Sequence, residues 1–122
     1  MNKKVLIADD EQNIVISLEF LMKREGFEVL VANDGDEAIQ RIRAERPDLV
    51  LLDVMMPKKS GFEVCQEVKG DPALGQVRIL MLTAKGRDTE VAKGLALGAD
   101  AYMTKPFSTR ELVDKVRSLL EH

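Results

Sequence analysis

The chain of 122 residues has the length of one domain, since domains cluster near about 100–150 residues. Its composition, 45% hydrophobic and 32% charged, is typical of a globular protein and excludes disordered and collagen-like chains. The net charge of −3 argues against direct binding of nucleic acid. No apolar run approaches the roughly 20 residues of a membrane span, and no signal peptide is evident. The single Cys65 has no internal disulfide partner, which favours a reducing cytoplasm.

Five short apolar runs predict five buried strands, because each run is rich in aliphatic residues and too short for a helix. The runs are residues 5–8, 29–32, 49–52, 79–82 and, more weakly, 101–103.

Amphipathic stretches between the runs predict helices. In the first stretch Ile14, Leu18 and Leu21 share a face, and Gly26 follows as a residue typical of a helix end. Three pairs have the spacing of a capping box: Asp34 with Glu37, Ser60 with Glu63, and Ser108 with Glu111. Helix ends are predicted near Pro47, Gly70 and Gly98. The last helix carries an apolar stripe made of Leu112, Val113, Val116, Leu119 and Leu120.

This alternation predicts an α/β fold: a flavodoxin-like, doubly wound, five-stranded parallel sheet with five helices on its two faces. Five strands favour the order 2-1-3-4-5 over the six-stranded dinucleotide-binding order. Ligands of such a sheet bind at the carboxyl ends of the strands, between the first and third. We assign residues 1–120 to this one domain and residues 120–122 to a remnant of an expression tag.

Charged and hydroxyl side chains follow four of the five predicted strands. They are Asp9, Asp10 and Glu11 after the first strand, Asp53 after the third, Thr83 after the fourth, and Thr104 and Lys105 after the fifth. Three carboxylates that converge at the switch point repel one another. A hard divalent cation such as Mg²⁺, which oxygen ligands suit, would neutralise them. Metal and ammonium together favour an ionised Asp53 and leave a place for a tetrahedral dianion, as in phosphoryl transfer to a carboxylate.

Each residue also has a simpler structural interpretation. The two acids after the first strand could form a turn and the N-cap of the first helix. Asp53 could be a turn residue and Lys105 a solvated lysine. We expect Met55 and Met56 to fill the core. Complementary chemistry at four strand ends favours the functional interpretation of the whole set.

With this set the sequence resembles the response-regulator receiver domain of bacterial two-component signalling, over residues 3–120. The matching residues are Asp9-Asp10, Asp53, Met56-Pro57, Gly61, Thr83-Ala84, Gly98-Ala99-Asp100 and Lys105-Pro106-Phe107. The resemblance implies a phosphorylation-driven switch without a separate substrate, which assists its own phosphorylation and dephosphorylation. The donor would be a sensor histidine kinase or a histidine phosphotransfer protein.

The resemblance also implies a role for each site residue. Asp53 would accept the phosphoryl group. Asp10, Asp53 and the backbone carbonyl of Met55 would ligate Mg²⁺ directly, and Asp9 would help through water. Thr83 and Lys105 would contact phosphate oxygens.

The output face implied by the resemblance is formed by the fourth helix, the fifth strand and the fifth helix. Tyr102 would be its aromatic switch, and a cis peptide is expected before Pro106. Gly86, Gly94 and Gly98 predict that this region is of low stability.

Subgroup features leave the oligomeric state open between a monomer and a phosphorylation-dependent dimer. Dimerising receivers commonly carry an acidic pair before the switch tyrosine, whereas this chain has one acid, Asp100, and Val91 replaces a basic residue. Glu111 and Lys115 are plausible halves of a charge network. Lys85 and Met55 flank the site and are expected to influence the phosphoryl lifetime.

Three other functions fit the sequence less well. A binding module that does not use phosphorylation would not need the complete set of acids and lysine. A haloacid-dehalogenase-type phosphatase would need a second Asp where this chain has Met55. A flavin carrier of the same fold would place its phosphate against Asp9, Asp10 and Glu11, which would repel it.

Overall fold

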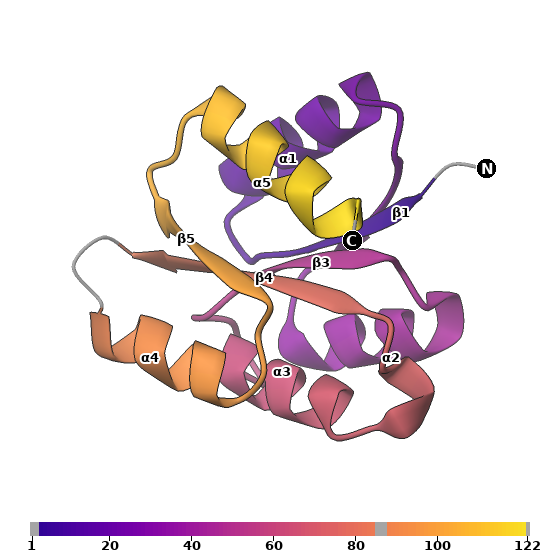
Figure 1. Cartoon of the computed structure of the whole chain (residues 1–122), viewed down its shortest axis with the longest axis vertical. Helices are drawn as coiled ribbons and strands as arrows, with labels where there is room; N and C mark the ends of the chain where they lie inside the picture. Colours follow the sequence, from indigo (N-terminus) through magenta and orange to yellow (C-terminus); the bar gives the residue numbers. More distant parts are fainter. Residues whose placement is uncertain (1–2, 85–87, 122) are drawn as a thin grey trace.

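The structure, a computed structural model, describes residues 3–84 and 88–121. The described residues form one parallel sheet in the order β2-β1-β3-β4-β5 with five α-helices around it, which confirms the predicted fold (Figure 1). The strands are β1 (Lys4–Ala8), β2 (Glu28–Ala32), β3 (Leu49–Asp53), β4 (Arg78–Ala84) and β5 (Ala101–Lys105). The helices are α1 (Gln12–Arg24), α2 (Gly35–Glu45), α3 (Gly61–Lys69), α4 (Asp88–Ala96) and α5 (Thr109–Leu120), with a short 3₁₀ turn, η1 (Pro72–Leu74).

The helices form two layers, with α1 and α5 on one face of the sheet and α2, α3 and α4 on the other (Figure 1). Side chains of a strand alternate between the faces. Leu6 and Leu52 therefore belong to the core beneath α2 and α3, whereas Ile7 and Leu51 belong to the core beneath α1 and α5. Because both faces are covered, the central strands read as continuous apolar runs.

The register aligns the carboxyl ends of the strands along one edge of the sheet. Asp53 pairs with Leu82, and Thr83 pairs with Thr104. Strands β4 and β5 extend beyond the apolar runs that predicted them. Thr83 and Lys105 therefore lie within the strands rather than after them. The parallel ladder therefore fixes the backbone of both residues.

The helix starts follow the predicted caps in part. Ser60 and Glu63 form a complete capping box at α3. At α2, Asp34 accepts from the backbone N–H of Glu37, but the Glu37 carboxylate accepts from the N–H of Asn33, one residue before the cap.

The alternative role for the acids after β1, as the N-cap of α1, is wrong. Glu11 occupies the N-cap position and makes no capping hydrogen bond with its side chain. Asp9 instead accepts from the N–H of Glu11 at 2.9 Å, as in an Asx turn. The side chain of Asp9 thus fixes the turn out of β1 and leaves Asp10 outside the helix. In the described part of the chain, no helix is long and apolar enough to cross a membrane.

Candidate functional site

Three carboxylates meet at the carboxyl edge of the sheet. Asp9 and Asp53 are buried, and Asp10 is exposed. One carboxylate oxygen from each lies within 4.8 Å of the others. Asp9 and Asp10 come from the end of β1 and Asp53 is the last residue of β3, so the adjacency of these two strands creates the cluster. An all-oxygen cluster of this size suits a hard divalent cation.

Lys105, at the end of β5, closes the site from the side of β4. Its ammonium nitrogen lies 2.9 Å from Asp9 Oδ2, 3.4 Å from Asp53 Oδ1 and 3.7 Å from Glu11 Oε1. The side chain is only 16% exposed, so the interpretation of Lys105 as a solvated lysine is wrong. The peptide bond from Lys105 to Pro106 is cis, as expected.

The surroundings of Asp53 favour the protonated form of its carboxyl group. Burial, and then the neighbouring charge of Asp9, raise the pKa of Asp53 to about 7, against the opposing effects of Lys105 and of a hydrogen bond from the Met55 N–H. Burial lowers the pKa of Lys105, but its hydrogen bond to Asp9 and the charges of Asp53 and Asp9 outweigh that effect and raise it. One ammonium group thus offsets the carboxylates only in part, and a bound cation would favour the ionised form of Asp53.

Thr83 contributes a hydroxyl group near the end of β4, the strand beside β3. The residue is 1% exposed, and within the described residues its Oγ1 has no hydrogen-bond partner. Buried hydroxyl groups are rarely left unpaired, because desolvation then has no compensation. The orphaned hydroxyl fits a site that receives an additional polar group.

The two methionines after Asp53 differ. Met56 packs against the core, as expected, but Met55 is 67% exposed, so its predicted role as core filler is wrong. Met55 instead contributes its backbone, since its N–H donates to the Asp53 carboxylate. Tyr102 is 44% exposed on β5. Lys85 and Gly86 lie outside the described residues.

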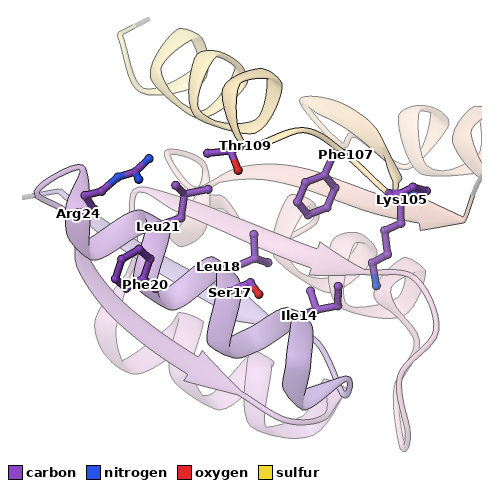
Figure 2. Close-up of a pocket in the computed structure, with 10 residues that line it drawn as sticks. Ile14, Ser17, Leu18, Phe20, Leu21, Arg24, Lys105, Phe107 and Thr109 are labelled. Carbon is purple, nitrogen blue, oxygen red and sulfur yellow. The ribbon is translucent and has the colours of Figure 1, made fainter.

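An apolar groove that the sequence did not predict adjoins the site. It has a volume of about 400 Å³ and lies between α1 and the segment that joins β5 to α5. Figure 2 shows Leu18 and Leu21 of α1 on one side, Phe107 on the other, and Lys105 at one end. Phe20, 67% exposed, also lines the groove. Because Phe20 lies off the predicted apolar face of α1, only its aromatic character in a solvated position could have signalled a surface role.

The fold and the site together define a class of protein. A five-stranded sheet in the order 2-1-3-4-5, with three acids and a lysine at its switch point, is the architecture of a receiver domain. A family model described as the response regulator receiver domain matches residues 5–117. The chain belongs to this family.

Individual relatives agree with this assignment. The chain is 48% identical over 120 residues to the alkaline phosphatase synthesis transcriptional regulatory protein PhoP of Bacillus subtilis, a match that covers 98% of the chain and 49% of PhoP. The chain therefore spans about half the length of that relative.

Solved structures give the same result. A response regulator from Chloroflexus aurantiacus is 35% identical and superposes with a TM-score of 0.96, with 100% of both chains covered. The chemotaxis protein CheY4 of Vibrio cholerae is 32% identical with a TM-score of 0.91, and 98% of this chain and 100% of CheY4 are covered. The family is a signalling domain rather than an enzyme with a separate substrate.

Proposed function

We propose that the chain is a phosphorylation-dependent switch that accepts a phosphoryl group on Asp53 from a histidine kinase or a histidine phosphotransfer protein. The observation that carries this proposal is the placement of Asp53, buried against Asp9 and within 3.4 Å of the Lys105 ammonium nitrogen. A carboxylate in this setting is a nucleophile whose charge is balanced by fixed groups. A carboxylate oxygen forms a bond to phosphorus while the bond from phosphorus to the donor imidazole nitrogen breaks.

Mg²⁺ is the cation that the acidic cluster fits best. Asp10, Asp53 and the backbone carbonyl of Met55 would hold it directly, and Asp9, already bonded to Lys105 at 2.9 Å, would act through water. When bound, Mg²⁺ supplies positive charge that keeps Asp53 ionised and offsets the charge of the phosphoryl oxygens.

Lys105 and Thr83 are the groups that would bind the phosphoryl oxygens. Lys105 can exchange its contact with the Asp53 carboxylate for a contact with a phosphoryl oxygen. Thr83 has a buried hydroxyl group that could donate to a phosphoryl oxygen and that finds no acceptor among the described residues. The same groups would assist hydrolysis of the acyl phosphate by water, so the domain would assist its own dephosphorylation. Met55, exposed beside the site, would then influence access of that water.

The phosphodonor would approach along the apolar groove on α1. The groove is continuous with the site because Lys105 belongs to both. Phe20 is exposed at its wall, and an exposed aromatic side chain beside a concave apolar surface is typical of a protein-binding site. A helix that carries the donor histidine could pack here and present its imidazole to Asp53.

Output would leave through the face made of α4, β5 and α5. A hollow on this face is lined by residues of all three elements, among them Leu95, Tyr102 and Lys115. Movement of Thr83 toward a phosphoryl group would leave space near α4 that Tyr102 could fill by rotating inward. This is a two-state packing element that one charge change can bias. A downstream effector, or a second phosphorylated copy, would bind the rearranged face.

The phosphoacceptor role is tested by incubation with acetyl phosphate and Mg²⁺, followed by mass spectrometry. The wild-type chain should gain one phosphoryl mass, and Asp53→Asn should gain none. Asp114→Asn, which removes an exposed carboxylate on α5, is the matched control and should label fully. Undiminished labelling of Asp53→Asn would refute the assignment.

The output face is tested by hydrogen exchange with and without beryllofluoride. Changes should concentrate between Ala84 and Lys105 and should shrink in Thr83→Ala, which should still accept the phosphoryl group. Changes confined to Asp9, Asp10 and Asp53 would contradict the switch. Light scattering under the same two conditions distinguishes a monomer from a dimer that forms on activation.

A further inference from the structure

Several backbone hydrogen bonds hold the loop of residues 54–60, which leads from β3 to α3, and two of them bear on the position of Met55. The carbonyl of Val54 accepts from the N–H of Gly61 at 2.8 Å, and the carbonyl of Pro57 accepts from the N–H of Gly35 at 3.2 Å. Met55 lies between these two carbonyl groups in the sequence. The first contact is local, but the second comes from α2, an element that supplies no acid or lysine to the site.

Gly35 packs against this loop at a distance that only glycine allows. A Cβ atom built on Gly35 would lie 2.1 Å from the carbonyl oxygen and 2.5 Å from the Cβ of Lys59. Contacts this short require something to move, and one of the two atoms is backbone. Glycine is therefore needed here for space, as at other close backbone approaches.

Other contacts between the loop and α2 are weaker. Lys58 lies 3.9 Å from Asp34, and both side chains are partly exposed. Surface ion pairs of this kind contribute little to stability. The backbone of Gly35 is thus the part of α2 that determines how closely the loop can approach it.

We infer that Gly35 is a positioning residue for the metal site. Its backbone contacts with Pro57 and Lys59, which we call the seat of the loop, fix the loop and with it the backbone of Met55. The inference rests on the proposed function, in which the Met55 carbonyl ligates Mg²⁺. A side chain at position 35 would push the loop away from α2 and displace that carbonyl, although no carboxylate or lysine of the site is changed.

The expected effect is large because Mg²⁺ tolerates little distortion. It demands near-ideal octahedral geometry with ligand distances of about 2.0–2.1 Å. Changes to the residues that orient metal ligands typically lower metal affinity by about 10–100-fold. Displacement of one carbonyl ligand should have an effect near the lower end of that range.

The first experiment is a Mg²⁺ titration followed by the backbone amide NMR signals of Asp53 and Met55. In Gly35→Ala the midpoint should lie about tenfold higher than in the wild type. Gly26→Ala is the matched control: Gly26 has φ +91°, so alanine there is strained, but nothing lies within 4 Å of the added Cβ. Gly26 also follows the carboxyl end of α1, at the opposite end of the sheet from the site. The control should lose stability and keep the wild-type midpoint.

Two outcomes would overturn the inference. One is an unchanged midpoint in Gly35→Ala, and the other is an equal increase in Gly26→Ala, which would make the effect one of general stability. A wild-type chain that shows no response to Mg²⁺ would instead overturn the Mg²⁺ site of the proposed function, and the role of Gly35 with it.

The second experiment needs only the wild-type chain and therefore holds even if Gly35→Ala does not fold. Because the N–H of Gly35 donates to Pro57, its hydrogen exchange reports directly on the seat. Exchange at Gly35 should slow as Mg²⁺ is added, with the midpoint seen for the Met55 amide. Exchange that stays constant while the Met55 signal saturates would show that the seat and the metal are independent.

Discussion

The chain leaves the site twice toward the same face of the sheet, after β3 and after β4, and the two segments are packed very differently. Each of the two strands has a candidate site residue near its end, Asp53 in β3 and Thr83 in β4. The helix that follows each strand, α3 or α4, has nine residues. α3 buries Gly61, Val64, Cys65 and Val68, and begins with a complete capping box. Within α4 only Gly94 is buried.

The difference separates a fixed part of the site from a part that can move. Burial of apolar side chains ties α3 to the core, so we expect the backbone around Asp53 to move less than the backbone around Thr83 when a ligand binds. Few buried contacts hold α4, and segments with few such contacts open at low free energy. The Thr83 hydroxyl group, which is buried without a partner in residues 3–84 and 88–121, adds an unfavourable desolvation energy on the same side.

In the metal-free protein, the negative charge of Asp53 should lower the free energy of unfolding more than any other single group of the site. Its pKa is about 7 in the folded chain and about 3.9 in an unfolded one. Between these pH values the folded chain retains a proton that the unfolded chain has released. The free energy of unfolding should therefore fall as pH rises from about 4 to about 7, and stay low above that. Asp53→Asn should remove this decrease.

At pH 8 without metal, Asp53→Asn should raise the free energy of unfolding by on the order of 2–3 kcal/mol, less than the full linkage value because Lys105 loses a partner. Urea denaturation at pH 4.5 and pH 8 measures both quantities. Addition of Mg²⁺ at pH 8 should stabilise the wild type more than the variant. Parallel stability curves for the two proteins across this pH range would contradict the raised pKa.

A matched pair of valine truncations compares the helices directly. Val68 of α3 is fully buried, whereas Val91 of α4 is half-buried. Val68→Ala should lower the free energy of unfolding by roughly 2 kcal/mol, through lost burial and the cavity that remains. Val91→Ala should lower it by less than about 1 kcal/mol, since alanine also has the higher helix propensity. Equal losses in thermal or urea unfolding would mean that α4 is as firmly packed as α3.

Replacement of the Thr83 hydroxyl group tests whether burial of this group lowers the stability of the protein. Thr83→Val keeps the branched shape and removes a buried hydroxyl group that has no partner in the described part of the chain, so the metal-free protein should gain about 1 kcal/mol of stability. The same variant should bind beryllofluoride with weaker coupling to the α4 amides. Destabilisation in urea unfolding would show that the hydroxyl group has a partner in solution.

The smallest expected effect concerns Gly94. A Cβ there would lie 3.5 Å from Met81 Cγ and 3.8 Å from Phe62 Cε1, which are ordinary contacts. Gly94→Ala should therefore stabilise the protein by about 0.5–1 kcal/mol, because glycine is costly inside a helix. Hydrogen exchange in α4 should slow, and the response to beryllofluoride should shrink. An unchanged exchange rate would indicate that α4 is already firmly held.

The sequence predicted the elements well where their signals are local. Apolar runs located the strands, and Ser60 with Glu63 located the start of α3. Strand ends were less accurate: β4 continues through Ala84, because a parallel ladder needs backbone partners rather than apolar side chains. The turn η1 was not predicted. Met55 was misplaced because its exposure depends on the loop around it, not on its own hydrophobicity.

The candidate site was predictable to a similar degree. Parallel strands bring their carboxyl ends to one edge, so the residues at those ends, Asp9, Asp53 and Lys105, were expected to meet, and they do. The apolar groove on α1 was not predictable, since its walls come from segments about 90 residues apart, such as Leu18 and Phe107. Nor was the seat of the loop on Gly35, which depends on where α2 lies against residues 54–60.

Periodicity and residue type are local properties, so the alternation of strands and helices and the chemical groups at the strand ends could be inferred from the sequence. The chemical behaviour of those groups depends instead on their surroundings in the folded chain. The pKa of Asp53 rises to about 7 because burial removes water from its carboxylate and the charge of Asp9 lies close by. Burial leaves the Thr83 hydroxyl group without a hydrogen-bond partner among the residues that the structure describes. Desolvation and Coulomb interactions act through space, so they depend on which distant segments of the chain the fold brings together.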